Sequence, residues 1–352
     1  MSRQGGGGRG GKQMPREVVL SKALSHLLRH SADRENLKIS KEGYVNVADL
    51  LETRKIKPLK ATLAEILESV SSSDKQRFSL LYVPATTPET ENDSHETQAD
   101  EKEEREKEKE GQQIAFATAA SEEKQKTATA HALSVRDSDA SHFLIRATQG
   151  HSMKCVDTTL FLEKLSLDGD DSIPEKSATA KALPDTVVHG TYHGAWPLIL
   201  ASGGLQAMNR AQVHFAVGPT VDEIFPNGRD APPAKLPTGK QNQNVISGMR
   251  SDAEILIYIN LQKALQAGCP FYRSENGVIL SEGMVSPDAD HTAGKSVPVE
   301  FFDLVVERKA GLGVLWEDGK LVQELPENLA AKKNPKSFRG GRGRGRGRGG
   351  HS

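Results

Sequence analysis

A run of eleven consecutive charged residues, DEKEEREKEKE, occupies positions 100–110 and limits what the middle of this 352-residue chain can fold into. The run has no apolar side chains with which to build a core. The Pro-, Thr- and Glu-rich sequence before it has the same character, so we predict a charged disordered insert over 84–135. Because Glu103 and Lys107 are spaced i,i+4, a lone exposed helix is the alternative for part of this segment.

Both ends of the chain also have compositions that favour disorder. Residues 1–15 are rich in glycine and arginine, and residues 330–352 end in an RGG-type repeat. With only 36% apolar residues in the whole chain, the apolar side chains must be concentrated in the regions between these segments. The net charge of −1 is the sum of an acidic middle and an arginine-rich tail, so the local charges matter more than the total.

The cysteines and the apolar stretches indicate the class of protein. Only Cys155 and Cys269 occur, with no CxxC and no His/Cys cluster at ligand spacing. We therefore expect neither a disulfide framework nor a structural zinc, as in a protein of a reducing compartment. No apolar stretch approaches the ~20 residues of a membrane span. We expect an intracellular protein, cytoplasmic or nuclear, that is monomeric and not bound to a membrane.

The first folded region is predicted over 16–83 and resumes after the insert at 136–157. Apolar residues with helical spacing in ALSHLL predict an amphipathic helix over 16–31. Asn46 can cap a second helix through ADLLETRK, LKATLAEILESV repeats the helical period, and RFSLLYV is a strand. Helices followed by a strand pair at this size favour a winged-helix unit, a pattern that other small helical domains share.

The second folded region is predicted over 183–325 and is rich in strands. EILIYINL, at 254–261, is almost continuously apolar and predicts a strand buried on both faces. Asn276-Gly277 lies between two extended runs, which is the strongest local signal for a β-hairpin. No GxGxxG follows a strand and no GxxxxGK[ST] is present, so neither a Rossmann site nor a P-loop is supported. The chain as a whole is predicted to be α+β.

Arginine and histidine side chains gather at the predicted ends of helices and strands. They form groups in the first helix, in LIRATQGHSM, in HGTYHG and in MNRAQVHF (Lys22, His26, Arg29, His30; Arg146, Gln149, His151, Ser152; His189, Thr191, Tyr192, His193; Arg210, His214). Taken singly, a solvated helix face and ordinary turns are the simpler interpretations. Together they favour an anion site, because guanidinium groups match phosphate oxygens. Without a carboxylate pair or metal triad, such residues favour stabilisation of a phosphate whose charge grows in the transition state.

The chain contains, in this order, SKALSHLLRH, GYVNVADLL, KQRFSL, IRATQGHSM, VHGTYHGAWPLIL, MNRAQVHF, ISGMRSDAEILIYINL and FYRSENGVIL. In order and content these motifs resemble the tRNA 2′-phosphotransferase family over about 18–83 and 141–307. The resemblance implies an N-terminal winged-helix lobe, a C-terminal ADP-ribosyltransferase-like lobe and an active site in the cleft between them.

The resemblance also implies roles for individual residues. The catalytic residues would be Arg29, His30, Arg146 and Arg210, the cofactor-binding residues His189, Gly190, Thr191 and His214, and the phosphate- and RNA-binding residues Gln149, His151 and Ser152. Val278 stands where protein ADP-ribosyltransferases carry a glutamate. Thr148 and Gln212 depart from the family pattern, in which asparagine and histidine are expected.

The implied reaction has two steps and consumes NAD as a co-substrate, with no metal. The 2′-phosphate of a spliced tRNA attacks the nicotinamide ribose and expels nicotinamide. The ribose 2″-hydroxyl then attacks phosphorus, releasing the RNA and ADP-ribose 1″,2″-cyclic phosphate. The alternatives are an ADP-ribosyltransferase that modifies terminal phosphates of nucleic acids and stops after the first step, and an inactive RNA- or ADP-ribose-binding module.

The C-terminal tail has a separate interpretation. It carries five glycine-spaced arginines and no acidic residue over 339–348 (Arg339, Arg342, Arg344, Arg346, Arg348). Such a segment can bind RNA through phosphate contacts and stacking without sequence preference. A disordered tail that only improves solubility is the alternative.

Overall fold

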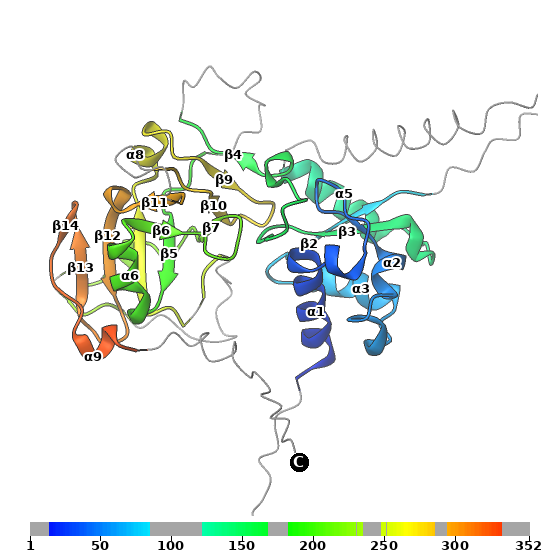
Figure 1. Ribbon diagram of the computed structural model, residues 1–352, viewed down its shortest axis with the longest axis horizontal. Helices are drawn as coiled ribbons and strands as arrows, with labels where there is room; N and C mark the ends of the chain where they lie inside the picture. The colour runs from blue at the N-terminus through cyan, green and yellow to red at the C-terminus, as the bar shows by residue number, and fades with distance from the viewer. Residues whose placement is uncertain are drawn as a thin grey trace, which may run out of the picture. The chain divides into compact units, whose positions relative to one another are not determined.

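The computed structural model describes residues 14–84, 122–167, 182–229, 231–234, 248–250, 252–285 and 294–332. The chain divides into two compact units, Met1–Glu163 and Lys164–Ser352, each with its own sheet structure (Figure 1). Most of the three segments predicted to be disordered lies outside the described ranges. Within those ranges, no helix is both long enough and apolar enough to cross a membrane.

The first unit combines helices with a three-stranded antiparallel sheet of order β1-β3-β2. Its described α-helices and strands are α1 (Arg16–His30), β1 (Val45–Asn46), α2 (Val47–Leu51), α3 (Leu63–Ser71), β2 (Phe78–Tyr82), α5 (Glu122–Ser134) and β3 (Phe143–Ala147).

Helix α1 buries the apolar stripe that predicted it. Leu24, Leu27 and Leu28 have no exposed surface, and Leu20 is 4% exposed. The predicted cap of α2 is also present, because the Asn46 side chain accepts a hydrogen bond from the backbone N–H of Ala48 at 2.9 Å. These two predictions are confirmed. Both rest on neighbours within a few residues, which sequence patterns describe well.

The prediction of a disordered insert over 84–135 is wrong at its C-terminal end. Residues 122–134 form α5, which lies along β2. Strand β2 is at the edge of its sheet, and Thr129 of α5 satisfies that edge: its Oγ1 accepts from Leu80 N at 3.1 Å and donates to Leu80 O at 3.4 Å. Gln125 and Ala132 are buried. The helix is therefore held by polar contacts, and such contacts do not produce a periodic pattern of apolar residues in the sequence.

The second unit is built from antiparallel strand pairs with short helices between them. Its sheets have the orders β14-β13-β12-β8-β5, β4-β9-β10-β7 and β11-β6. The elements are β4 (Glu163–Lys164, at the division between the units), β5 (Val188–Thr191), α6 (Trp196–Ala201), β6 (Gly204–Gln206), β7 (Val213–Phe215), α7 (Val221–Ile224), β8 (Ile255–Ile259), α8 (Leu261–Gln266), β9 (Phe271–Arg273), β10 (Ile279–Ser281), β11 (Ser296–Pro298), β12 (Phe302–Glu307), β13 (Gly313–Glu317), β14 (Lys320–Leu321) and α9 (Glu327–Ala330).

Strand β8 is buried on both faces, as its apolar run predicts. Ile255, Ile257 and Ile259 pack into one hydrophobic core, and Leu256 and Tyr258 pack into a second. Because side chains alternate along a strand, these are the two faces of the central sheet.

The Asn276-Gly277 hairpin is also confirmed. The turn joins the antiparallel strands β9 and β10, with Gly277 at φ +75°. Helices and several antiparallel sheets together confirm the α+β class.

Glu307, at the end of β12, is a charged residue in the interior of the second unit. It has no exposed surface, and its carboxylate accepts hydrogen bonds from the backbone N–H groups of Lys309, Ala310 and Leu312 at 2.7–3.0 Å. His193 Nε2 lies 2.8 Å from the same carboxylate. These hydrogen bonds outweigh burial and hold the pKa of Glu307 below its usual range. Glu307 thus fixes the turn after β12 against the segment that follows β5.

Replacing Glu307 with alanine should destabilise the second unit by about 3–5 kcal/mol, because buried donors and His193 lose their partner. Denaturant unfolding of the purified chain, followed by circular dichroism, measures the change. Glu324→Ala removes an exposed glutamate and should change the free energy of unfolding by less than ~0.5 kcal/mol. Equal effects of the two substitutions would contradict this role for Glu307.

Candidate active site

The first unit brings together two of the predicted motifs, LRH at the end of α1 and QGHS after β3. The backbone N–H of Ser152 donates to the carbonyl oxygen of Arg29 at 2.9 Å. The Ser152 hydroxyl and His30 Nδ1 are hydrogen-bonded, also at 2.9 Å. These contacts join residues 122 and 123 positions apart in the sequence. Arg29, His30, His151 and Ser152 therefore form one cluster.

His151 is the buried centre of this cluster. It is 1% exposed, and among the described residues neither of its ring nitrogens has a hydrogen-bond partner. Burial, followed by the charges of Arg29, Arg146 and His30, lowers the pKa of His151 to about 3. The ring is therefore uncharged at neutral pH although positive charges surround it. A Cβ at Gly43 (φ +84°) would lie 3.3 Å from His151 Nε2, so a glycine at this position leaves room for the ring.

Arg146, on β3, lies in the same cluster with no exposed surface. Its guanidinium carbon is 4.8 Å from the ring centroid of Tyr44 and 4.3 Å from that of Phe161. Nη2 donates to Gln125 Oε1 at 2.5 Å, and Nη1 lies 3.5 Å from the carbonyl oxygen of Glu42. Arg146 is therefore held inside the unit and is not open to solvent in this structure.

The other residues predicted near the cluster are placed differently. Lys22 and His26 are exposed on α1, where Lys22 Nζ contacts Met14 Sδ at 3.0 Å and His26 Nδ1 contacts Lys55 Nζ at 2.7 Å. For this part of the helix the simpler interpretation, a solvated face, holds. Gln149 is half-buried. Thr148, the departure from the family pattern, is buried and donates to the carbonyl oxygen of Gln76 at 3.1 Å, so it is part of the unit's packing.

In the second unit, His189 on β5 and His214 on β7 lie together. His189 Nδ1 donates to the carbonyl oxygen of His214 at 2.9 Å, and its ring packs edge-on against Phe215. Burial, together with the charges of Arg250 and Arg210, lowers the pKa of His189. Because a carbonyl oxygen only accepts, the neutral ring carries its proton on Nδ1 and leaves Nε2 as an acceptor. His214 Nδ1 in turn lies 3.0 Å from the carbonyl oxygen of Gln212.

Gly190 and Thr191 hold β5 against its neighbours. A Cβ on Gly190 would come within 2.4 Å of the Met249 side chain and 2.8 Å of Ala253, so glycine permits this approach. Thr191 is 7% exposed, and its carbonyl oxygen accepts from the backbone N–H of Glu254 at 2.8 Å. Both residues thus have structural roles beside the cofactor-binding role predicted for them.

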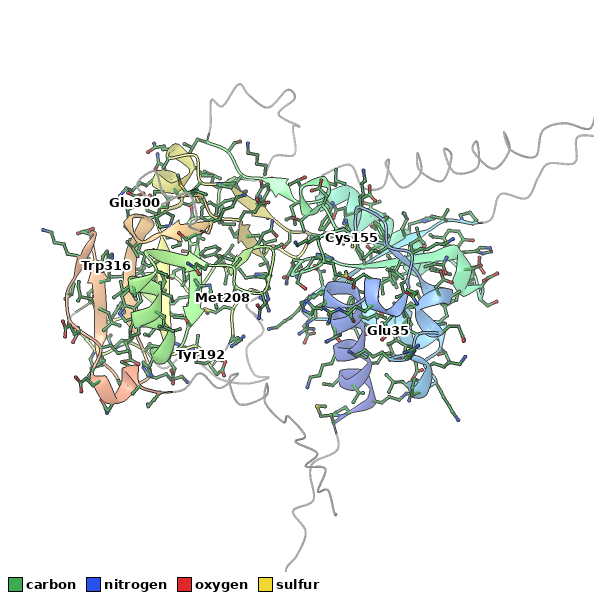
Figure 2. All side chains as sticks on the ribbon, viewed as in Figure 1. Glu35, Cys155, Tyr192, Met208, Glu300 and Trp316 are labelled. Carbon is green, nitrogen blue, oxygen red and sulfur yellow. The ribbon has the colours of Figure 1, made fainter. Side chains whose placement is uncertain are left out.

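Arg250 has no role in the sequence-based prediction, although the motif SGMR that contains it was recognised. Its Nη1 donates to the Tyr192 hydroxyl at 3.0 Å, and that hydroxyl donates to Asp252 Oδ2 at 3.0 Å. Its guanidinium also lies over the Tyr192 ring, 5.4 Å from the centroid. Figure 2 labels Tyr192, which directly follows β5. The hydrogen-bonded trio Arg250–Tyr192–Asp252 places a second positive charge, that of Arg250, near His189 in addition to the charge of Arg210.

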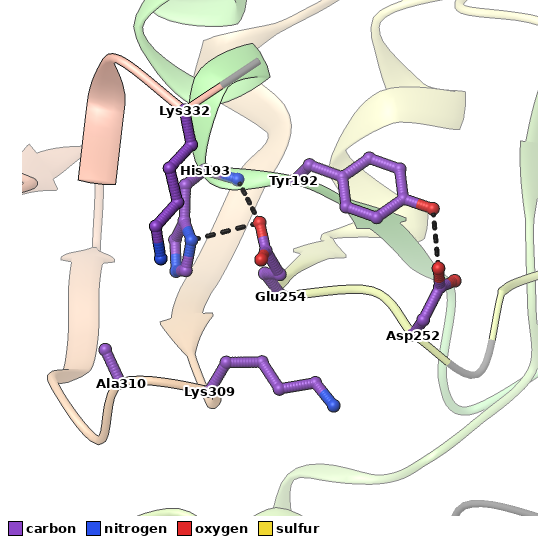
Figure 3. A pocket seen from close by; sticks show the side chains of 7 residues that line it. All are labelled: Tyr192, His193, Asp252, Glu254, Lys309, Ala310 and Lys332. Carbon is purple, nitrogen blue, oxygen red and sulfur yellow. Dashed lines mark hydrogen bonds and ion pairs between the residues drawn. The ribbon is translucent and has the colours of Figure 1, made fainter. Parts of the chain in front are cut away.

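A pocket of about 450 Å³ opens beside this trio (Figure 3). Tyr192 and Asp252 belong to both the trio and the pocket lining, and the other lining residues are of mixed charge (His193, Glu254, Lys309, Ala310, Lys332). His193 is buried between two carboxylates, with Nδ1 3.0 Å from Glu254 and Nε2 2.8 Å from Glu307. This histidine of HGTYHG is thus a packed, paired residue. His189, Arg210 and His214 do not line the pocket.

The predicted RNA-binding arginines Arg339, Arg342, Arg344, Arg346 and Arg348 lie outside the described residues. Val278 is fully buried, and a Cβ on Gly248 would come within 3.1 Å of it. No group of three or more His, Cys, Asp or Glu side chains arranged to hold a metal ion occurs in the described part of the chain.

Comparison with known proteins gives a consistent result. The chain is 30% identical to tRNA 2′-phosphotransferase 1 of Danio rerio, over 78% of this chain and 83% of that protein. It is 29% identical to tRNA 2′-phosphotransferase 1 of Homo sapiens, over 77% and 72%. It is 27% identical to tRNA 2′-phosphotransferase of Saccharomyces cerevisiae, over 83% and 84%. The sequence model of the RNA 2′-phosphotransferase family matches residues 15–283, and the chain therefore belongs to the RNA 2′-phosphotransferase, Tpt1 / KptA family.

Proposed function

We propose that this chain is an NAD-dependent RNA 2′-phosphotransferase that acts on spliced tRNA. The proposal rests on one main observation. Arg29 and His30 lie together with His151 and Ser152 in one positively charged cluster. Family membership and the names of the relatives give the reaction class. We further propose that the first unit is a winged-helix lobe and the second an ADP-ribosyltransferase-like lobe. The helices packed around a small antiparallel sheet support the first assignment, and the antiparallel sheets support the second.

The cluster in the first unit suits the 2′-phosphate. Arg29 and His30 lie at the end of α1, and the exposed Ser152 hydroxyl lies beside them. The neutral His151 ring can donate one N–H to a phosphate oxygen, and that would give a buried polar atom its partner. A dianionic phosphate would also offset the positive charges that lower the pKa of His151. These residues would therefore hold the phosphate by charge-assisted hydrogen bonds. Gln149 follows β3 in the same loop and would contribute to RNA binding.

The residues of the second unit suit NAD. His189 presents an acceptor at Nε2, because its Nδ1 proton is held by the carbonyl oxygen of His214. An acceptor at this place fits a ribose hydroxyl, which donates. We place Gly190, Thr191 and His214 at the same subsite. Arg210 and Arg250 add positive charge near His189, which favours a pyrophosphate or a phosphate whose charge is growing.

The proposed reaction transfers the phosphate in two balanced steps. A 2′-phosphate oxygen bonds to C1″ of the nicotinamide ribose, and the C1″–N bond breaks with its electron pair on nicotinamide. The ribose 2″-oxygen then bonds to phosphorus, the bond to the RNA 2′-oxygen breaks, and the hydroxyl proton ends on that oxygen. Because the second attack is intramolecular, it needs mainly charge stabilisation. We assign that stabilisation to Arg146 and Arg210, and the grip on the phosphate to Arg29, His30 and Arg146.

An internally 2′-phosphorylated oligonucleotide tests the function directly. Incubated with the full chain and NAD, it should lose its 2′-phosphate and yield nicotinamide and ADP-ribose 1″,2″-cyclic phosphate. Mass spectrometry of both products measures the outcome, and the reaction without NAD is the control. A stable ADP-ribosylated RNA would favour the one-step transferase. Unchanged RNA at high enzyme concentration would favour a binding module.

Two substitutions should separate the steps. His189→Ala should block the first step, because the acceptor for the ribose hydroxyl is lost. Arg146→Ala should slow the second step more than the first, since one contact to the developing charge is worth ~2.7–4 kcal/mol. Rapid-quench analysis should then show 2′-phospho-ADP-ribosylated RNA accumulating only with Arg146→Ala. His26→Ala changes an exposed histidine of α1 and should alter neither step. Loss of NAD binding in Arg146→Ala, without intermediate, would refute its assignment.

The arginines of the C-terminal tail (Arg339, Arg342, Arg344, Arg346, Arg348) are proposed to capture RNA without taking part in chemistry. Glycine-spaced arginines can neutralise successive phosphates along an RNA backbone without sequence preference. Deleting residues 337–352 should shallow the log–log salt dependence of RNA affinity by roughly 3, at ~0.7 for each of four to five phosphate contacts.

The single-turnover rate at saturating RNA should stay unchanged in the truncated chain. If the salt dependence of RNA affinity is unchanged, the tail would contribute to solubility alone. If the single-turnover rate at saturating RNA falls strongly, the tail would act at the active site.

A further inference from the structure

Helix α5 touches the phosphate-binding cluster through one buried side chain. Gln125 is 1% exposed, and its Oε1 accepts from Arg146 Nη2 at 2.5 Å. Its Nε2 donates to the carbonyl oxygen of Phe161 at 3.0 Å. The Phe161 ring in turn packs against Arg146 and, edge-on, against His151. The amide oxygen of Gln125 therefore accepts a hydrogen bond from Arg146 Nη2, a donor that could otherwise bind a phosphate oxygen.

The burial of Arg146 decides how this contact is interpreted. A residue that only positions Arg146 would leave part of the guanidinium open toward the substrate. Arg146 instead has no exposed surface, because Gln125 and the rings of Tyr44 and Phe161 surround it. A phosphate that binds Nη2 in place of Gln125 therefore has to displace this contact.

The way α5 is docked makes such a movement feasible. Among the side chains described in the helix, only Gln125 and Ala132 are fully buried, so little apolar surface holds it. The helix also contacts β2 through polar hydrogen bonds of Thr129 to Ser79 and Leu80, and through the His131 ring, whose centroid lies 6.1 Å from that of Tyr82. Elements with few buried apolar contacts open at the lowest cost in free energy.

We infer that α5 is an autoinhibitory helix, in which Gln125 occupies the place on Arg146 that the RNA 2′-phosphate takes after the helix undocks. The inference rests on the proposed phosphate-binding function of this cluster. A phosphate dianion forms stronger hydrogen bonds to a guanidinium group than a neutral amide does, so the substrate can displace Gln125. As long as the docked state dominates, the apparent affinity for the phosphate falls by the fraction of open molecules.

Two substitutions at one position test this in the full chain. Gln125→Ala removes the competing oxygen and should lower KM for the 2′-phosphorylated oligonucleotide about tenfold, the worth of one hydrogen bond to a charged group. Gln125→Glu places a carboxylate on Arg146 and should raise KM by at least as much. The value of kcat should stay within twofold in both variants. Ala130→Ser, on the exposed face of α5, is the control and should leave KM unchanged.

Thr129→Val provides a second variant that does not touch Arg146. It removes the acceptor of the Leu80 N–H, so it should favour undocking and lower KM in the same direction as Gln125→Ala. Hydrogen exchange of the wild-type chain gives an independent measurement. The α5 amides should exchange faster when the 2′-phosphorylated oligonucleotide is added, and an unphosphorylated oligonucleotide of the same sequence should have no such effect.

The opposite outcomes overturn the inference. If both Gln125 variants lower kcat and leave KM unchanged, Gln125 positions Arg146. If neither variant changes KM, or if the phosphorylated oligonucleotide slows exchange in α5, the helix does not compete with the phosphate. If wild-type protein binds the oligonucleotide without turnover, only the proposed reaction is refuted. The dissociation constants of the same variants would then still test whether Gln125 competes with the phosphate for Arg146. Wild-type protein that does not bind it would refute both.

Discussion

The positive charge gathered around His151 is the constraint on which the first unit depends. Burying guanidinium groups is unfavourable unless rings, carbonyl oxygens or amides replace water around them. Arg146 meets this requirement with the rings of Tyr44 and Phe161, and with Gln125. His151 meets it by remaining uncharged. The end of α1, the loop after β3 and α5 all contribute residues to this cluster.

The elements that sequence patterns predicted are those whose cause is local. The leucine stripe of α1 and the apolar run of β8 have a period that follows directly from burial on one or both faces. The Asn276-Gly277 turn needs only its own conformational preference. Helix α5 has no such local cause. Its sequence shows little amphipathic character and follows a charged run, and it is held by Thr129 and Gln125 through contacts that no periodicity records.

The candidate site can be divided in the same way, into residues that the sequence identifies and features that only the structure reveals. Residue types and motifs make Arg29, His30, His151 and His189 candidates, because arginine and histidine at element ends suit phosphate and ribose recognition. Sequence could not show that Arg146 is buried behind Gln125, nor which nitrogen of His189 carries the proton. That proton is fixed by a backbone carbonyl oxygen on β7, 25 positions away. Arg250 was missed because its motif was recognised without a chemical role, and its role depends on Tyr192 and Asp252.

The packing around Val278 fits the proposal that the nucleophile brings its own charge. Val278 has no exposed surface and packs beside Gly248, whose Cβ would lie only 2.4 Å from the carbonyl oxygen of Phe215. A carboxylate at this place would lose its hydration and have little room for a compensating partner. A general base at position 278 is therefore unfavourable in this packing. A phosphate dianion needs no base in order to attack C1″, so the reaction that we propose is compatible with an apolar side chain where protein ADP-ribosyltransferases carry a glutamate.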